Sequence, residues 1–122
     1  LVASWFDLIL HHGSLPTDPN QLYAKMFKKY IGLDLPAGAM FAAGWGHILG
    51  GYDSGYYSYI WSQVYAADVF GRFVKEGLFN QAIGRDYRCL LEVGASVDEM
   101  KTLVTFLGRR PSRAAYLKQI DL

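Results

Sequence analysis

The 122-residue sequence has little of what marks several common classes of protein. It contains one cysteine, Cys89, so no internal disulfide can form, and we expect a reducing compartment: the cytoplasm, with the mitochondrion as the alternative. The formal net charge is only +1, without the basic excess of an electrostatic nucleic-acid binder. No apolar run approaches the roughly 18–20 residues of a membrane-spanning helix. We therefore predict neither a nucleic-acid partner nor a membrane partner.

The first residues indicate a fragment. The segment LVASWFDLIL is amphipathic and has no basic region before its apolar part, so it does not resemble a signal peptide. The sequence also begins without methionine. Because 52% of the residues are apolar, the chain is typical of a folded protein rather than a disordered one. We expect a piece of a larger domain, cut within a helix.

Turn and capping signals divide the sequence into helices. Asp18 is a typical N-cap with Pro19 at the first helical position, and Ser96 with Glu99 forms a capping-box pattern. No alternating run is long enough for a sheet, so the predicted fold class is all-α. The helices are expected at residues 1–11, 19–32, about 55–76, about 80–91, 97–108 and 111–119, with a long connection at 33–55.

The most informative stretch is GWGHILGGYDSGYYSYIW, residues 44–61, with five glycines, one histidine and four tyrosines. Glycine costs about 0.5–1 kcal/mol relative to alanine within a regular element. A tyrosine buried without a partner also leaves its hydroxyl unsatisfied. This composition favours a flexible loop that closes over a ligand, followed by a helix that presents hydroxyls to it. It indicates recognition of a polar, extended substrate.

Helical spacing places Tyr56, Tyr59 and Gln63 on one face, with Tyr52 just before it. A tyrosine hydroxyl has a reference pKa of about 10, so it stays protonated at neutral pH and can donate to a developing oxyanion. The alternative is an aromatic helix surface that only packs on its neighbours. The opposite face is expected in the core and carries Tyr57, Ile60, Trp61, Val64, Val69, Phe70 and Phe73.

Other candidate constellations are weaker. His11 and His12 are adjacent and diverge on a helix, which indicates a solvated helix end rather than a metal site. Arg109, Arg110 and Arg113 could bind a substrate carboxylate or simply face solvent at a helix end. The acidic residues Asp53, Asp68 and Glu76 show no metal-ligand spacing, and no serine lies in a nucleophile elbow. The residues alone therefore indicate a binding surface.

Four segments of the sequence extend the interpretation: GHILGGYDSGYYSYIWSQVYAADVF, FVKEGLFN, IGRDYRCLLEVGAS and TFLGRRPSRAAYL. In order and spacing, the stretch from Asp18 to Leu117 resembles the C-terminal end of the thimet oligopeptidase and neurolysin family of zinc metallopeptidases. Bacterial oligopeptidases and dipeptidyl carboxypeptidases belong to the same family. The pattern Y-D-x-x-Y-Y-x-Y-x-W is most similar to the thimet oligopeptidase and neurolysin branch. Trp45 stands where many relatives carry phenylalanine.

The resemblance implies a nearly all-helical enzyme whose deep channel admits short peptides and excludes folded proteins. The family's zinc is held by the two histidines of H-E-x-x-H and a downstream glutamate, with the motif's own glutamate as general base. This sequence holds only His11, His12 and His47 and no H-E-x-x-H. We therefore expect residues 1–122 to be a C-terminal fragment of a metallopeptidase catalytic domain, with zinc bound only by the full-length protein.

The resemblance also implies roles for individual residues. Tyr59, helped by Tyr56, is expected to donate to the oxyanion of the tetrahedral intermediate. His47 and Tyr52 are expected to position the peptide through its backbone. The loop glycines, expected to let the loop close over substrate, are Gly44, Gly46, Gly50, Gly51 and Gly55.

A second hypothesis is a non-catalytic helical interaction module that self-associates through exposed apolar faces. The expected partners are short peptides, the remainder of the catalytic domain, and further copies of the isolated chain. An H-E-x-x-H motif encoded upstream would favour the oligopeptidase. The choice between endopeptidase and dipeptidyl carboxypeptidase stays open.

Overall fold

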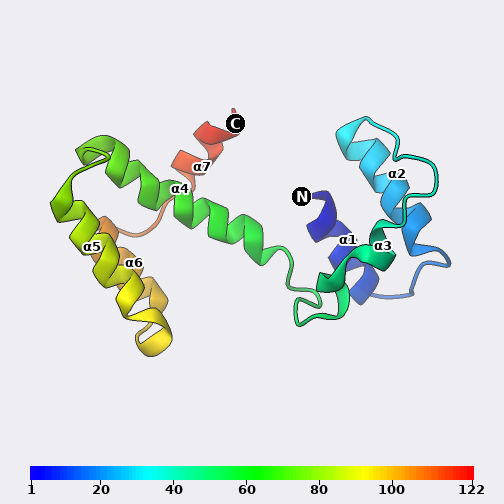
Figure 1. The fold of residues 1–122 in the computed structure, drawn as a ribbon, viewed down its shortest axis with the longest axis horizontal. Coiled ribbons are helices and arrows are strands. Elements are labelled where there is room, and N and C mark those ends of the chain that lie inside the picture. Colours follow the sequence, from blue (N-terminus) through cyan, green and yellow to red (C-terminus); the bar gives the residue numbers. More distant parts are fainter. The chain divides into compact units, whose positions relative to one another are not determined.

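The computed structural model describes residues 1–122, which form helices joined by turns, with no β-strand (Figure 1). This confirms the all-α fold class. No helix of the chain is both long enough and apolar enough to span a lipid bilayer. The elements are α1 (Val2–His11), α2 (Pro19–Ile31), α3 (Phe41–Gly44), the 3₁₀ turn η1 (Gly46–Leu49), α4 (Ser58–Glu76), α5 (Gln81–Glu92), the 3₁₀ turn η2 (Gly94–Ser96), α6 (Glu99–Leu107) and α7 (Ala114–Gln119).

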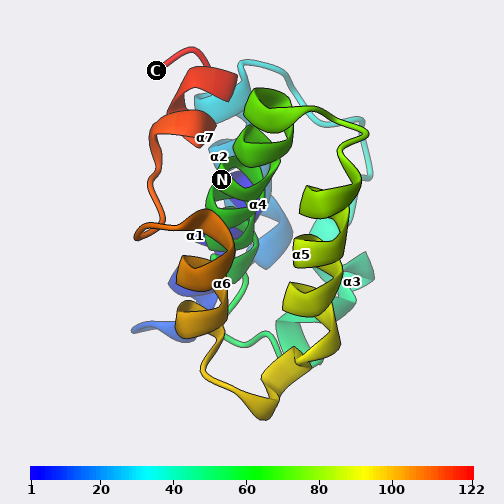
Figure 2. The same ribbon diagram turned by 90° about the vertical axis from the view of Figure 1, so that its left-hand side faces the viewer.

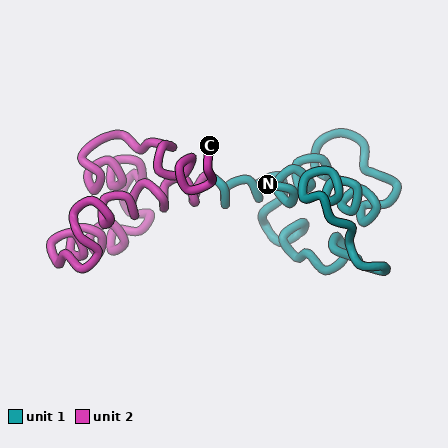
Figure 3. Tube along the Cα trace, turned by 90° about the horizontal axis from the view of Figure 1, so that it is seen from above, with its two compact units in different colours: residues 1–60 teal, residues 61–122 magenta.

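The chain divides into two compact units, Leu1–Ile60 and Trp61–Leu122, which Figure 3 distinguishes by colour. Each unit has its own apolar core and is described separately below.

The first unit is built on α1 and α2. The Asp18 carboxylate caps α2 by accepting the N–H groups of Asn20 at 2.9 Å and Gln21 at 3.1 Å. Gly32 ends the helix with a φ of +85°, a left-handed conformation that favours glycine. Both ends of α2 therefore lie where the sequence predicts them.

The core of this unit surrounds Phe6, whose side chain is completely buried. The ring of Tyr23 meets Phe6 edge-on, with centroids 5.1 Å apart, and stacks on Phe41 at 3.8 Å. Val2 and Leu10 lie one helical turn on either side of Phe6 and are buried in the same cluster. The buried residues of α1 thus form part of the core against which the loop after α3 packs, through Trp45 and Ile48.

The second unit packs α5 and α6 alongside each other, as Figures 1 and 2 both show. Its core is aromatic: the rings of Phe73, Tyr87 and Phe106 lie with centroids 5.6–6.2 Å apart. Ile83 on α5 is almost completely buried. The Arg72 guanidinium lies over the Phe106 ring at 4.7 Å and donates to the carbonyl oxygen of Phe106 at 2.6 Å.

Hydrogen bonds link α4 to the segment between α6 and α7. The carboxylate of Asp68 accepts two hydrogen bonds from Arg109, at 2.6 and 2.8 Å, and one from the backbone N–H of Ser112 at 2.8 Å. Asp68 is only 3% exposed. Arg109 is therefore paired with an internal carboxylate of this chain, while its side chain stays 52% exposed and faces solvent as predicted.

The predicted capping box before α6 is wrong. Ser96 lies in η2, and its hydroxyl donates to the carbonyl oxygen of Val93 at 2.6 Å. Asp98 caps the helix instead, accepting the N–H of Lys101 at 2.8 Å. The serine hydroxyl bonds to a local backbone acceptor, and Asp98, two residues later, caps the helix.

Two boundaries around the glycine-rich segment differ from the prediction. The connection at 33–55 is not irregular throughout, because it contains α3 and η1. The helix α4 begins at Ser58 rather than near Gly55, since residues 51–57 form turns. The chain nevertheless turns in a helical way just before α4, because the N–H of Tyr59 donates to the carbonyl oxygen of Tyr56 at 3.2 Å.

The face of α4 expected in the core is partly open. Tyr57, Trp61 and Phe70 are 46%, 56% and 57% exposed. Asp68 is the only buried residue of the helix. The face is therefore covered only in part, since Phe73 packs on Tyr87 and Phe106 in the core of the second unit.

Candidate functional site

The glycine-rich loop after α3 has a conformation that requires glycine at two positions. A Cβ at Gly50 would lie 2.6 Å from the carbonyl oxygen of Gly46, a distance that real Cβ atoms do not tolerate. Gly51 has a φ of +88°. Together they turn the chain sharply after η1, so that the residues before and after the turn approach each other.

This turn brings the four predicted site residues that have aromatic rings into one cluster, while the other two, Gly50 and Gly51, form the turn itself. His47 lies at its centre and meets Tyr52, Tyr56 and Tyr59 edge to face, with centroids 5.5, 5.1 and 6.0 Å away. Tyr52 stacks on Tyr59 at 5.3 Å, and Tyr56 lies 4.8 Å from Tyr59. We call these four residues the tyrosine cluster.

The cluster is open to solvent, and the hydroxyl of Tyr59 keeps its proton at neutral pH. Tyr52 and Tyr59 are 39% and 40% exposed, so a ligand can reach them. Hydrogen bonding with Tyr52, followed by desolvation and the charges of Tyr52 and Tyr56, raises the pKa of Tyr59 above its ordinary value. Tyr59 is therefore a hydrogen-bond donor throughout the physiological range.

Trp45 connects the cluster to the core of the first unit. Its indole stacks on Phe6 with centroids 5.9 Å apart and meets Tyr56 edge to face at 4.7 Å. It also lies 6.0 Å from His47. No role for Trp45 is predicted from the sequence. Its place next to the Gly-His pair was the available signal, but contact with α1 cannot be read from local spacing.

Asp7 is the second residue that sequence reasoning missed. It lies on α1, is 1% exposed, and accepts the N–H groups of Ser54 at 3.1 Å and Tyr56 at 3.0 Å. The Nδ1 atom of His11 lies 2.9 Å from the same carboxylate. His11 lies at the end of α1 as predicted, but its side chain is only 22% exposed because it packs against Asp7. An acidic residue on the buried face of an amphipathic helix was the available signal.

Comparison with known proteins places the chain among peptidases. The model of Peptidase family M3 matches residues 1–122, the whole of the sequence. The chain belongs to Peptidase family M3.

Relatives agree with the assignment to family M3. A thimet-like oligopeptidase from Dictyostelium discoideum is 36% identical over 120 residues, and oligopeptidase A from Escherichia coli is 36% identical over 122 residues. In both comparisons the match covers 96% of this chain and 18% of the relative. The organellar oligopeptidase A of Arabidopsis thaliana is 34% identical over 126 residues, covering 95% of this chain and 16% of the relative. The chain thus spans less than a fifth of the relatives' length.

The residues of this family M3 chain do not fit a zinc ion. No group of three or more histidine, cysteine, aspartate or glutamate side chains could hold a metal. His47 is surrounded by aromatic rings, while His11 contacts Asp7. Zinc requires three or four nitrogen, sulfur or oxygen ligands converging on one point, which these histidines do not provide.

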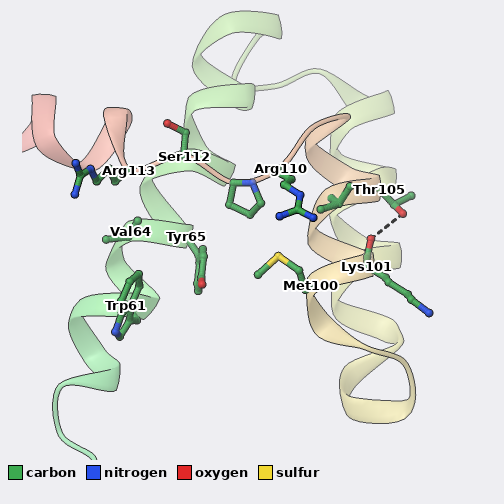
Figure 4. A pocket seen from close by; sticks show the side chains of 11 residues that line it. Trp61, Val64, Tyr65, Met100, Lys101, Thr105, Arg110, Ser112 and Arg113 are labelled. Atoms are coloured by element: carbon green, nitrogen blue, oxygen red, sulfur yellow. Dashed lines mark hydrogen bonds between the residues drawn. The ribbon is translucent and has the colours of Figure 1, made fainter.

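A groove of the family M3 chain lies elsewhere, in the second unit (Figure 4). It has a volume of about 920 Å³ and is formed by α4, α6 and the segment before α7. No residue of the tyrosine cluster lines it. Its apolar side chains include Trp61, Tyr65, Met100 and Val104, joined by Arg110 and Arg113.

Proposed function

We propose that this chain forms the substrate-binding part of the catalytic domain of a zinc metallo-oligopeptidase that hydrolyses short peptides. Membership of family M3 supports a peptidase. The observation that carries the proposal for this segment is the tyrosine cluster, in which three tyrosines surround His47. Solvent-accessible donors held by a rigid aromatic base suit the recognition of a peptide, whose backbone is rich in carbonyl acceptors.

In this proposal Tyr59 donates a hydrogen bond to the oxyanion that forms when the scissile carbonyl is attacked. A donor placed for the oxyanion lowers the barrier because it interacts more strongly with the transition state than with the substrate. The raised pKa of Tyr59 supports this role, since the hydroxyl keeps the proton that it donates. Tyr56, with its ring centroid 4.8 Å from that of Tyr59, is the second donor.

His47 and Tyr52 orient the peptide, by hydrogen bonds to its backbone. Both belong to the segment whose path depends on Gly50 and Gly51. A segment with two obligatory glycines can change conformation at small cost in steric energy, which suits a loop that closes after substrate enters.

The zinc ion of the proposed enzyme is held by residues outside this chain, because the side chains here do not form a metal site. We propose that an H-E-x-x-H motif in another part of the same domain supplies them. The contribution of residues 1–122 is then to bind and orient the peptide and to stabilise developing negative charge.

The exposed apolar surface supports a second part of the proposal. Trp61, Phe70 and Phe79 are 56%, 57% and 97% exposed, which is unusual for aromatic side chains of a folded protein. We propose that they pack against the remainder of the catalytic domain. The isolated chain should then self-associate, detectable as a concentration-dependent mass in sedimentation equilibrium.

The test of the proposed function is a peptidase assay on the full-length protein that contains this chain. Quenched-fluorescent peptides of about ten residues should be cleaved, and a zinc chelator should abolish the cleavage. A folded protein substrate of similar sequence content is the control and should resist cleavage. A well-folded, zinc-loaded full-length protein that leaves all short peptides intact would contradict the proposal.

A further inference from the structure

The buried carboxylate of Asp7 ties α1 to the loop that carries the tyrosine cluster. Its Oδ1 atom accepts the N–H of Ser54 at 3.1 Å, and its Oδ2 atom accepts the N–H of Tyr56 at 3.0 Å. These bonds cross 47 and 49 positions of the sequence. No other hydrogen bond joins residues 51–57 to α1, α2 or α3.

The loop conformation at this point needs such support. Ser54 has a φ of +58°, a left-handed conformation that non-glycine residues seldom adopt unless their surroundings hold them there. The residue is followed directly by Gly55 and Tyr56, so its conformation sets the direction in which the chain enters α4. The hydrogen bond from the Ser54 N–H to Asp7 is therefore made at a residue whose backbone conformation is unfavourable without such support.

The effect of Asp7 reaches Tyr59 through the backbone. Asp7 fixes the N–H of Tyr56, and the carbonyl oxygen of Tyr56 accepts the N–H of Tyr59 at 3.2 Å. Trp45 holds the Tyr56 ring at 4.7 Å. The position of Tyr56 is thus determined at both its backbone and its side chain, and Tyr59 follows it one turn later.

His11 completes the arrangement. Its Nδ1 atom lies 2.9 Å from the Asp7 carboxylate and 2.9 Å from the Asp7 carbonyl oxygen. The ring nitrogen hydrogen-bonds to the carbonyl oxygen, and the imidazole lies against Oδ1, the oxygen that accepts the N–H of Ser54. The carboxylate therefore has a partner from its own helix and two from the loop, which makes its burial tolerable.

We propose that Asp7, oriented by His11, is a positioning residue that holds Tyr56 and Tyr59 where they meet the peptide carbonyl. This inference rests on the proposed function of the tyrosine cluster. Asp7 itself does not touch substrate. Its contribution is the placement of donors, and a small misplacement of an oriented group can cost a large factor in rate.

The test is a double-mutant cycle in the full-length enzyme, combining Asp7→Asn with Tyr59→Phe. Asparagine keeps the shape of aspartate but replaces one acceptor oxygen with an N–H₂ donor, which faces a loop N–H. Asp7→Asn should lower kcat by about tenfold or more with little change in KM. In the Tyr59→Phe background the same substitution should change kcat by less than about threefold, because the donor that Asp7 places is already gone.

Asp68→Asn is the matched control. Asp68 is also a buried carboxylate that accepts a backbone N–H from a distant segment, the N–H of Ser112, but it belongs to the second unit, whereas the cluster belongs to the first. It should lower thermal stability while leaving kcat within about threefold. An effect of Asp7→Asn on kcat that is equally large with and without the Tyr59 hydroxyl would overturn the positioning role.

The outcomes separate the two proposals. If Tyr59→Phe leaves kcat unchanged, the proposed function of the cluster fails. If Tyr59→Phe lowers kcat but Asp7→Asn does not, only the positioning role fails. If the Asp7→Asn variant does not fold, His11→Leu replaces it in the double-mutant cycle with Tyr59→Phe. This substitution removes only the imidazole, from a partly exposed position. It should lower kcat several-fold only when the Tyr59 hydroxyl is present, and an unchanged kcat would overturn the proposal.

Discussion

The indole of Trp45 meets the ring of Tyr56 edge to face, with centroids 4.7 Å apart. The same indole stacks on the fully buried Phe6 at 5.9 Å. Trp45 therefore connects the buried core of the first unit to the tyrosine cluster.

Replacing Trp45 should affect both stability and the cluster. Trp45→Ala should lower the free energy of unfolding by about 2–4 kcal/mol, because it removes a large, partly buried ring and leaves a cavity. Trp45→Phe keeps a ring between Phe6 and Tyr56 and should cost less than half as much. Urea denaturation of the chain at several concentrations measures both values. Equal losses for the two variants would show that ring contact at this position contributes nothing.

Gly50 provides a second test. Gly50→Ala places a methyl group 2.6 Å from the carbonyl oxygen of Gly46, so the turn after η1 must shift. In the full-length enzyme, kcat/KM for a short peptide should fall by about tenfold or more.

Gly46→Ala is the control for Gly50→Ala. A Cβ at Gly46 meets nothing within 4 Å, and its φ is not in the positive range. It should leave kcat/KM within about threefold. If both substitutions act alike, the close approach of Gly50 does not determine the loop's path.

The ion pair of Asp68 and Arg109 predicts a dependence of stability on pH. Hydrogen bonds from Arg109, followed in size by an opposing desolvation effect, hold the pKa of Asp68 below its ordinary value. The unfolded chain therefore binds more protons than the folded chain as pH falls below about 4, the ordinary aspartate pKa. The stabilisation is complete above that pH and is lost as pH falls toward the lowered pKa.

Thermal unfolding between pH 6 and pH 2.5 checks this dependence. The difference in Tm between the wild type and Asp68→Asn should be constant above about pH 5 and shrink below about pH 4. Arg109 is 52% exposed, so solvent screens the pair and the difference is expected to be moderate. A Tm difference that does not change with pH would contradict the depressed pKa.

Metal content gives a further prediction. The isolated 122-residue chain should bind no stoichiometric zinc and hydrolyse no quenched-fluorescent peptide, since its side chains form no metal site. Elemental analysis after brief chelation measures this. About one retained zinc ion per chain would show that a site exists which the geometry does not reveal.

Local signals in the sequence predicted most of the helices. Asp18, Gly32 and Gly108 act at helix ends through their own conformations or nearest neighbours, so they could be read without a structure. The predicted N-cap of α6 was wrong because two side chains that can cap a helix, Ser96 and Asp98, lie within three residues of each other. Which of them caps depends on the path of the folded chain.

The four residues of the tyrosine cluster were also named from sequence, and the structure brings them together. Their roles stay predictions. Asp7 and Trp45 were missed because their contacts with Tyr56 depend on how α1 meets a loop some 40 to 50 positions away. Periodicity marks α1 as amphipathic but cannot say which residue of the loop its buried carboxylate will meet.

The central claim is that the hydroxyl of Tyr59 acts in the transition state. We predict that Tyr59→Phe in the full-length enzyme lowers kcat by about 10²-fold or more while KM changes little, because only the oxyanion interaction is lost. Thermal stability should change by less than the roughly 1–3 kcal/mol of an ordinary destabilising substitution, since the ring is retained.

Tyr57→Phe is the matched control for that measurement. Tyr57 is two residues earlier, is 46% exposed and contacts none of the rings of the cluster. Its substitution should leave kcat within a few-fold. The most direct test of the account is therefore the ratio of kcat for Tyr57→Phe to kcat for Tyr59→Phe, measured on the same short peptide. We predict a ratio of about 10²; a ratio near one would show that the tyrosines serve packing alone.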